Sequence, residues 1–218
     1  GYIQLLPTTD PATGATNHKI VESTNIYVNK QGNRFVNEQG RRDVLAKAAL
    51  AQPDHVFYVI GTEQTLLKDK EGRGPYGILI FDLLKQKKAF KADTLDELAD
   101  KMGFTGAAKD TFLATVERYN ELYDKQNDED FGKPAYRLSA IRTAPFYGCW
   151  LGASLLTTEQ GIAINEKGQA LDNDNKPMPG LYVTGDMSGS FFANNYPCLM
   201  AGVAMGRTLT FAKIGRAS

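Results

Sequence analysis

The chain has 218 residues, of which 42% are hydrophobic and 23% are charged, as is usual for a globular protein of one or two domains. Its 25 Lys and Arg residues balance 25 Asp and Glu residues, so it lacks the basic surplus of a nucleic-acid-binding protein. No apolar run reaches the roughly eighteen residues that a membrane-spanning helix needs. Cys149 and Cys198 lie far apart, and His18 and His55 show no metal-ligand spacing. The sequence therefore predicts neither a disulfide framework nor a metal site.

The first third of the chain predicts a strand, a hairpin, a helix and a second strand. The apolar opening Tyr-Ile-Gln-Leu-Leu is typical of a strand interior, and because it has neither Met nor a signal-like segment we expect a piece of a longer protein. Ile26 and Val28 alternate with polar residues before a K-Q-G-N turn with a left-handed glycine, which predicts a β-hairpin. The Ala- and Leu-rich run 41–52 predicts a helix that Pro53 closes, and HVFYVI at 55–60 predicts a buried strand.

Two further helices are expected in the middle of the chain. In TLDELADKMGF, Thr94 and Glu97 have the spacing of a capping box, and Gly103 supplies a left-handed C-terminal residue. The next segment places apolar residues on one helical face, namely Phe112, Val116, Tyr119 and Tyr123. The polar residues 124–136 then predict a loop.

From about residue 143 the pattern changes to that of short β-strands. Strands are expected in PFYGCWLGASLL, in GIAINEKGQALD with a turn at Lys167 and Gly168, and in GLYVTGDMSG. The Leu-Tyr-Val-Thr run of the last segment is typical of a buried parallel strand. A final helix is expected to start at Pro197, and its alanines and glycines predict close packing. Together these elements predict an α+β fold.

Residues 72–77 spell G-x-G-x-x-G, the glycine pattern of dinucleotide-binding loops. A working pattern follows a strand directly and opens a helix. Here the charged residues KDKE precede Gly72, and Pro75 removes an amide donor where a phosphate would need one. We therefore interpret this segment as a loop that leads into a helix at ILIFDLLKQK, and not as a cofactor site.

The segment PGLYVTGDMSGSFFANNYPCLMAG carries the stronger signal for chemistry. Its strand ends at Gly185 and Asp186, and a loop of small residues leads through Pro197 to a helix N-terminus. A carboxylate just past a strand end can accept hydrogen bonds from ribose or ribityl hydroxyls, and a helix N-terminus favours an anion. From the local residues alone, a strand–loop–helix corner with Asp186 as a cap is equally consistent.

In its motifs and their order, the chain resembles the flavoproteins related to fumarate reductase, urocanate reductase and the 3-ketosteroid dehydrogenases. GLYVTGDMSG and LMAGVAMGRTLTFA are similar to the strand, loop and helix that the family directs at its flavin. GNRFVNEQGRRDVLAKAA is similar to the G-x-R-F-x-N-E hairpin, R-D pair and helix of the family's capping domain. TFLATVERYNELYDKQNDEDFGK resembles the cap helix and its following loop, and YIQLLPT resembles a strand with the pattern I-Q-x-H-P-T.

The resemblance implies an α+β chain in two parts. Residues 1–142 would be mainly an α/β capping, or substrate-lid, domain of the fumarate-reductase flavoprotein type. Residues 143–218 would be the C-terminal strands and last helix of a Rossmann-like FAD-binding domain. The missing N-terminal half of that domain would lie upstream in the same protein, so the fragment alone is expected to be inactive. The cofactor-binding residues that the resemblance implies are Gly185, Asp186, Ser188, Gly189, Pro197, Leu199 and Met200.

The resemblance also gives roles to single groups. Asp186 would hold the ribityl chain of FAD, and amides around Leu199 and Met200 would face the N1/C2=O edge of the flavin. Arg42 matches the family's cap arginine, which protonates the substrate carbon while flavin N5 delivers hydride. Because a guanidinium holds its proton firmly, Arg42 would need a relay, and His18 falls near the family's relay carboxylate. Judged from the residues alone, Arg42 would instead belong to a solvated charge pair at a helix start.

Three positions depart from the fumarate-reductase pattern. The histidine of I-Q-x-H-P-T is Leu6, a second substrate histidine is replaced near Leu156 or Thr157, and a second substrate arginine falls at Tyr196. Since these groups clamp two carboxylates in fumarate reductases, the sequence predicts a substrate other than fumarate or succinate. Tyr196 is more similar to the tyrosine that contacts the substrate carbonyl region in ketosteroid dehydrogenases, which gives it a candidate catalytic role.

The sequence therefore predicts an FAD-dependent oxidoreductase that reduces an activated C=C bond in a flat, weakly charged substrate. Aromatic residues that would suit such a substrate, with core packing as the alternative, are Phe191, Phe192, Tyr196, Tyr147 and Trp150. An electron-donor domain or protein is a further expected partner. Two alternatives stay open, namely a dehydrogenase of the 3-ketosteroid type and a non-enzymatic, cap-like binding module without flavin.

Overall fold

The computed structural model describes residues 3–9, 24–67, 69–73, 80–158, 160–192 and 202–217. The chain forms two compact units, one of residues 6–154 (the large unit) and one of residues 1–5 and 155–218 (the small unit). The division falls within strands β1 (Ile3–Thr9) and β5 (Phe146–Thr158). The units are defined by packing, and the functional division after residue 142 stays a prediction.

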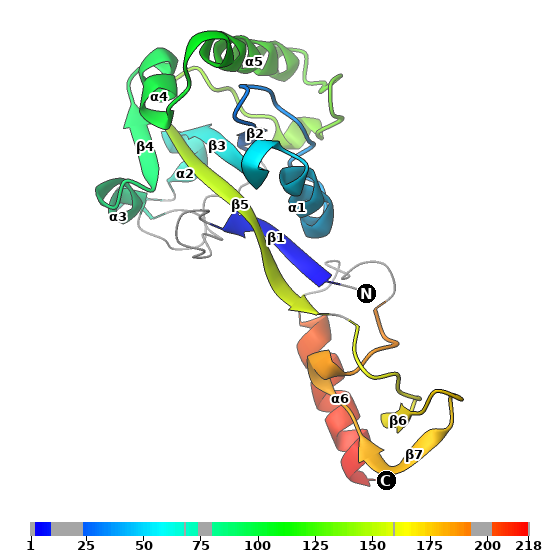
Figure 1. The fold of residues 1–218 in the computed structure, drawn as a ribbon. Helices are drawn as coiled ribbons and strands as arrows, with labels where there is room; N and C mark the ends of the chain where they lie inside the picture. The colour runs from blue at the N-terminus through cyan, green and yellow to red at the C-terminus, as the bar shows by residue number, and fades with distance from the viewer. Residues whose placement is uncertain are drawn as a thin grey trace. The chain divides into compact units, whose positions relative to one another are not determined.

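The large unit is built on a sheet with the strand order β1–β5–β3–β2, in which β4 also pairs with β5 (Figure 1). The predicted buried strand is confirmed as β3 (Val56–Thr62), which pairs antiparallel with β2 (Ile26–Val28) and with β5. The strand β4 (Ala89–Ala92) lies antiparallel to the first residues of β5. Every residue of β3 is buried, because its alternating side chains enter two different cores.

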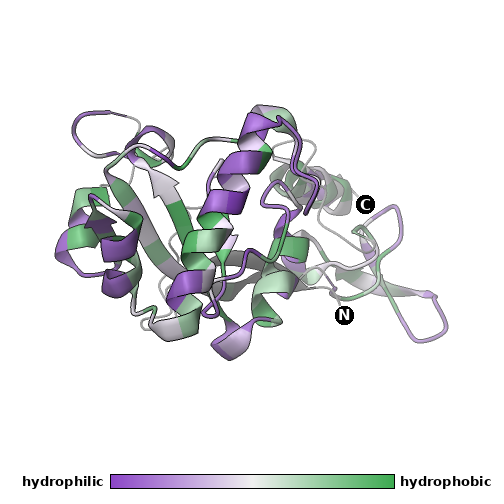
Figure 2. Cartoon of the chain, turned by 90° about the horizontal axis from the view of Figure 1, so that it is seen from above, coloured by the Kyte–Doolittle hydropathy of each residue, from purple (hydrophilic) through white to green (hydrophobic). Residues whose placement is uncertain are grey.

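Helices cover this sheet on both faces. Tyr58 and Ile60 enter a first core that is shared with α4 and α5, and Phe57 and Val59 enter a second core that is shared with the other three helices. The bounds of the five helices are α1 (Arg42–Leu50), α2 (Glu63–Leu66), α3 (Ile80–Lys85), α4 (Leu95–Met102) and α5 (Gly106–Asp124). In Figure 2, hydrophilic and hydrophobic stretches alternate along these helices, as expected for elements with one buried side.

The helix ends follow the sequence signals with one exception. The predicted helix 41–52 is confirmed as α1, and Pro53 opens a short 3-10 turn, η1 (Pro53–His55). At α4, the Thr94 hydroxyl accepts a hydrogen bond from the Glu97 amide at 3.1 Å, and Gly103 ends the helix at φ 86°. The Glu97 carboxylate, however, accepts from the Asp93 amide, so only half of the predicted capping box forms.

The predicted hairpin after β2 is correct only at its turn. Gly32 has a φ of 87°, as predicted, but the returning strand is reduced to a single bridge between Val28 and Arg34. The Asn29 side chain accepts hydrogen bonds from the amides of Gln31 and Asn33, which organises the segment as a loop. One edge of β2 therefore contacts this loop through the single bridge at Val28, and the other edge pairs with β3.

The small unit contains a two-stranded antiparallel sheet of β6 (Gln169–Leu171) and β7 (Pro177–Tyr182). The predicted turn at Gly168 is confirmed, with φ 77°. The prediction of a buried parallel strand here is wrong, since β7 is antiparallel to β6 and Leu181 is 42% exposed. Within the described residues β7 has one partner strand, and the local core is small: Ile164, Ala170 and Val183, with Phe211 packed against it.

The small unit ends in helix α6 (Val203–Ala217), which begins later than predicted. Pro197 lies outside the described residues, but Gly202 has φ 84°, which a continuous right-handed helix cannot contain. Close packing was predicted at Ala201, Gly202, Ala204 and Gly206, but a Cβ atom at Gly202 or Gly206 would meet none of the described residues within 4 Å. Close packing occurs instead at Gly215, which was not part of the prediction and where a Cβ atom would lie 3.1 Å from Tyr182. Among the described residues, no helix has the length and apolar character needed to cross a membrane.

Candidate functional site

The predicted cofactor-binding residues that the structure describes lie together in one tight turn after β7. Gly185 starts this 185–189 turn with a φ of 72°, and residues 185–187 form the 3-10 turn η3 (Gly185–Met187). The Gly185 carbonyl accepts hydrogen bonds from the Ser188 amide at 3.1 Å and from the Ser188 hydroxyl at 2.8 Å. Ser188 is only 1% exposed, so its hydroxyl closes the turn from inside.

A second backbone segment supports the 185–189 turn from behind. The Ile162 amide donates to the Met187 carbonyl at 2.9 Å, and the Gly189 amide donates to the Ile162 carbonyl at 2.7 Å. A Cβ atom at Gly161 would lie 1.9 Å from the Met187 oxygen, and one at Gly189 would lie 2.7 Å from the Gly161 oxygen. Both positions therefore require glycine, and the turn is held close to the segment beside it.

Asp186 is an exposed residue of this supported turn. An exposed carboxylate on an anchored glycine turn past a strand end is chemically suited to accept hydrogen bonds from the hydroxyls of a cofactor such as FAD. The residues present therefore fit the ribityl-binding role that the resemblance implies. The other predicted cofactor residues, Pro197, Leu199 and Met200, lie outside the described residues, as do Tyr196 and His18.

Sequence reasoning missed Arg207, which lies on α6 and contacts the same turn. Its Nη2 donates a hydrogen bond to the Gly185 carbonyl, while its Nε and Nη1 are buried and have no hydrogen-bond partner among the described residues. The guanidinium carbon lies 5.1 Å from the centre of the Phe191 ring and 5.0 Å from that of Phe192. The available signal was a single charged residue inside the small and apolar run AGVAMGRTLTFA.

In the large unit, the predicted catalytic residue Arg42 is the first residue of α1. Its neighbour Arg41 is the N-cap residue, and both side chains are exposed. With the residues that the structure describes, the Arg42 side chain makes no hydrogen bond or ion pair. Its donors are thus available, although the structure shows no group that would select Arg42 over Arg41.

The G-x-R-F-x-N-E motif instead builds a buried ion cluster in the large unit. The Arg34 guanidinium donates to both oxygens of Glu38 at 2.8 Å and to both oxygens of Asp128 at 3.0 and 2.7 Å. The Lys133 ammonium lies 3.2 Å from the Glu38 carboxylate and donates to the Tyr119 hydroxyl at 3.0 Å. The Glu38, Asp128 and Lys133 side chains are 0% exposed. The motif therefore joins the loop after β2 to α5 and to the loop that follows it.

Burial and pairing shift the ionisation of this cluster in opposite directions. Burial lowers the pKa of Lys133 to about 8, against the attraction of Glu38, and burial raises the pKa of the Tyr119 hydroxyl. At Asp128, burial acts to raise the pKa, but hydrogen bonds from Arg34 and the Lys133 amide outweigh it and lower the pKa. Sequence reasoning missed Asp128 and Lys133 because the polar segment 124–136 is typical of a solvated loop.

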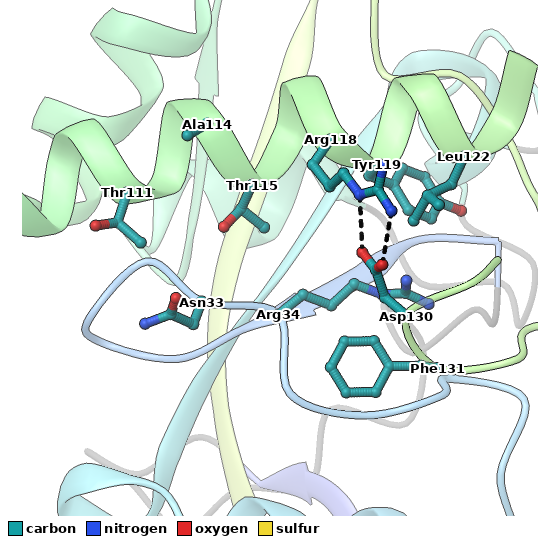
Figure 3. A pocket seen from close by; sticks show the side chains of 10 residues that line it. All are labelled: Asn33, Arg34, Thr111, Ala114, Thr115, Arg118, Tyr119, Leu122, Asp130 and Phe131. Carbon is teal, nitrogen blue, oxygen red and sulfur yellow. Dashed lines mark hydrogen bonds and ion pairs between the residues drawn. The ribbon is translucent and has the colours of Figure 1, made fainter.

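A pocket of about 300 Å³ adjoins this cluster, between α5 and the loops at residues 33–34 and 130–131 (Figure 3). Arg118 at its edge pairs with Asp130 at 2.9 Å, and the Thr115 hydroxyl donates to the Gly32 carbonyl at 2.7 Å. The polar groups around this pocket are thus used in contacts between α5 and the loops, which indicates a structural role.

The predicted aromatic substrate cluster does not form as one group. Tyr147 is 1% exposed in the second core of the large unit, and Trp150 packs against the first core, on the other face of the sheet. The prediction is wrong for this pair, and the alternative of core packing holds for both. Tyr147 and Trp150 differ by an odd number of positions along β5, so they point to opposite faces. In the part of the chain that the structure describes, no three His, Cys, Asp or Glu side chains are grouped so that they could hold a metal ion.

The mixed helix and sheet fold and the supported glycine turn after β7 agree with the class of flavoprotein that the sequence predicts. Residues 3–198 match the FAD binding domain family, and the chain belongs to this family. The predicted family, the α+β fold class and the cofactor FAD are thereby confirmed.

Relatives and solved structures agree with this assignment. The chain is 33% identical over 199 residues to an NADH:fumarate oxidoreductase of Klebsiella pneumoniae, covering 89% of this chain and 20% of the relative. It is 35% identical over 136 residues to a 3-oxosteroid 1-dehydrogenase of Mycolicibacterium smegmatis, covering 56% of this chain and 23% of the relative. The structure of a flavocytochrome c3 fumarate reductase in its open conformation matches with a TM-score of 0.71 and 27% identity, over 98% of this chain and 36% of that chain. The chain therefore spans about a fifth of these two curated relatives.

Proposed function

We propose that the protein to which this chain belongs is an FAD-dependent oxidoreductase that reduces an activated C=C bond. The observation that carries this proposal is the family match over residues 3–198, supported by relatives named for redox chemistry at carbon–carbon bonds. The remaining FAD-binding sequence and an electron donor are the partners that such a reaction needs. We propose that residues 1–142 are mainly the substrate lid and residues 143–218 the cofactor-binding segment.

In this proposal the small unit binds the cofactor. The Asp186 carboxylate accepts hydrogen bonds from ribityl hydroxyls, and Gly185 and Gly189 shape the turn that carries this carboxylate. Ser188 closes the turn, and the segment around Pro197, Leu199 and Met200 faces the ring system. When bound, FAD supplies hydride-transfer chemistry. The support for these roles is the exposed carboxylate on a turn that two glycines and a neighbouring segment hold in place.

The large unit supplies the proton in this proposal. Arg42 donates it to the substrate carbon, and His18 returns a proton to Arg42. A guanidinium can act in this way only if its charge is not locked in a structural ion pair. Arg42 meets this condition within the described residues, whereas Arg34, the other motif arginine of this unit, uses its donors on Glu38 and Asp128.

We further propose that the substrate carries at most one carboxylate and is neither fumarate nor succinate. The support is the replacement of charged or ionisable clamp residues by Leu6 and Tyr196. A site with one guanidinium and a tyrosine can bind one carboxylate or a carbonyl, but it cannot pair two carboxylates at once. Enones, aryl acrylates and steroid-like enones have the required chemistry.

A dehydrogenase that works in the oxidising direction is the second candidate. It is favoured by the N-x-Y-P run at 194–197 and by the 35% identity to a 3-oxosteroid 1-dehydrogenase. In that case Tyr196 would act on the base side of the reaction, and Arg42 would be dispensable.

A substrate screen on the full-length protein tests these proposals. The FAD-loaded protein is reduced without oxygen and mixed with fumarate, an acrylate, an aryl acrylate, an enone and a steroid enone, while the flavin absorbance is followed. We expect rapid reoxidation by at least one substrate with no more than one carboxylate, and slow reoxidation by fumarate. Fast reoxidation by fumarate alone would contradict the substrate proposal. A colourless protein that added FAD does not reconstitute would contradict the enzyme proposal and favour a binding module.

A further inference from the structure

Arg207 is a buried cation that the chemistry proposed above does not use. It is 6% exposed, and its Nη2 donates to the Gly185 carbonyl, while Nε and Nη1 have no hydrogen-bond partner in the part of the chain that the structure describes. Burying N–H donors of a charged group without partners costs free energy. An apolar side chain of similar size would avoid this cost. Core packing alone therefore does not explain an arginine at position 207.

The rings of Phe191 and Phe192 provide the other contacts of this guanidinium. Its carbon lies 5.1 and 5.0 Å from the two ring centres, within the range of cation–π attraction. The two rings meet edge to face at 5.0 Å, and Phe191 also meets Phe211 of α6 at 6.4 Å. Arg207 therefore contacts both ends of the segment 185–192, its first carbonyl and its last two side chains.

The Gly185 peptide is the part of this segment that most needs an external anchor. Its φ of 72° is one that glycine adopts without strain, but glycine also leaves the backbone free to rotate elsewhere. The two hydrogen bonds from Ser188 close the turn upon itself. The bonds from Arg207 to the Gly185 carbonyl and from the Thr184 hydroxyl to the Thr208 carbonyl, at 3.0 Å, instead tie the turn to α6.

We propose that Arg207 is a positioning residue that fixes the 185–192 segment in the conformation that binds FAD. This inference rests on the proposed cofactor role of the 185–189 turn. Arg207 holds the carbonyl that precedes Asp186, and through it the direction of the Asp186 carboxylate. A planar guanidinium can donate in its plane to a carbonyl and also face aromatic rings, whereas a lysine ammonium is a point charge without this geometry.

The test compares R207M, R207K and R216M in the full-length protein. Arg216 lies on α6 and is exposed, so R216M removes a charge from the same helix without touching the turn. The measurements are the dissociation constant of FAD, from flavin fluorescence, and the thermal midpoint of the cofactor-free protein. We expect R207M to bind FAD about tenfold more weakly or worse, which corresponds to the loss of one hydrogen bond to a charged group. R207K should lie between R207M and wild type, and R216M should equal wild type.

The thermal midpoint separates positioning from a general effect on folding. Because replacing a buried ion by a well-packed apolar group is often neutral or stabilising, we expect the cofactor-free R207M protein to be at least as stable as wild type. Unchanged FAD affinity in R207M would overturn the inference. A loss of FAD affinity that is fully explained by the fraction of unfolded R207M protein would overturn it as well. If R207M does not fold, R207K is judged by the same criteria, and failure of both to fold would assign a purely structural role. A wild-type protein that cannot bind FAD would contradict the proposed function itself.

Discussion

Arg34 of the large unit and Arg207 of the small unit are both buried arginines, but their surroundings differ. Arg34 donates four hydrogen bonds to two carboxylates. Burial acts to lower its pKa, but the hydrogen bonds to Glu38 and Asp128 outweigh this effect and raise the pKa. Among the described residues, Arg207 contacts one carbonyl and two aromatic rings, and its Nε and Nη1 nitrogens have no hydrogen-bond partner. The charge of Arg34 is compensated by two carboxylates, whereas Arg207 has no ion-pair partner among the described residues.

We infer that this difference separates a structural charge from one that serves the proposed cofactor site. Arg34 connects segments that are 94 residues apart in sequence, and its donors are used within the cluster. Arg207 contacts a loop that carries the proposed cofactor residues and fixes its backbone without neutralising any charge. Buried charge alone therefore does not identify a functional residue, and the way its donors are used is more informative.

Breaking the Arg34 network should give the largest effect on stability. Asp128→Asn removes one of the two negative charges that pair with Arg34 in a buried site, and Glu38 supplies the other. We expect the free energy of unfolding to fall by about 3–5 kcal/mol, as measured by urea denaturation of the full-length protein. Asp130→Asn is the matched control, because Asp130 pairs with the half-exposed Arg118 and should cost at most about 1 kcal/mol. Equal costs for the two variants would contradict a structural role for the cluster.

The same cluster should give stability a dependence on pH in the alkaline range. Lys133 has a pKa lowered from 10.5 to about 8, mainly by burial. Between these values the unfolded chain binds more protons than the folded chain, so the free energy of unfolding rises with pH. We expect a gain of about 1–2 kcal/mol between pH 8 and about pH 9.5, which Lys133→Met should lack. Measurements should stop below about pH 10, since the raised pKa of Tyr119 makes stability fall above it. If the free energies of unfolding of wild type and Lys133→Met differed by the same amount at every pH from 8 to about 9.5, the lowered pKa of Lys133 would be contradicted.

The 185–189 turn offers a smaller but more selective test. Gly185→Ala places a Cβ atom at a φ of 72°, where the nearest side-chain atom, of Thr208, is 3.8 Å away. The strain should lower the free energy of unfolding by about 1 kcal/mol. Gly180 has a φ of 75°, and a Cβ atom there would have no neighbour within 4 Å among the described residues, so Gly180→Ala carries similar strain outside the turn. Thermal unfolding should change alike in the two variants, while only Gly185→Ala should weaken FAD binding. Weaker FAD binding in both Gly185→Ala and Gly180→Ala would contradict a specific role of the 185–189 turn in binding the cofactor.

Local patterns predicted the elements of the large unit well. The helical spacing around Phe112 and Val116, the half-formed cap at Thr94 and the apolar run of β3 all depend on neighbours in sequence. Both faces of β3 are buried, and a continuous apolar run is what such a strand requires. The predictions of the strand after Gly32 and of the start of α6 were wrong. In both places one side chain or one backbone angle determines where the element ends or begins. The strand after Gly32 was lost because the Asn29 side chain organises a loop there, and α6 begins late because Gly202 takes a left-handed conformation.

The site was predicted only as far as motifs extend. The motif singled out Gly185, Asp186, Ser188 and Gly189, which the structure brings into one turn; their cofactor-binding role stays a prediction. Arg207 was missed because its contact with Gly185 spans 22 residues, and sequence spacing does not show which side of α6 faces the turn. Asp128 and Lys133 were missed for the same reason, since their partners lie in the loop after β2.

The reoxidation rate of the reduced, FAD-loaded protein by its best substrate tests the central claim most directly, with Arg42→Ala compared to wild type and Arg41→Ala as the control. Both arginines are exposed at the start of α1, so the two variants lose the same charge from the same place. If Arg42 is the proton donor, Arg42→Ala should slow reoxidation by about 10²–10⁴-fold with FAD affinity unchanged, and Arg41→Ala should have little effect. Reoxidation of Arg42→Ala at the wild-type rate would contradict the account.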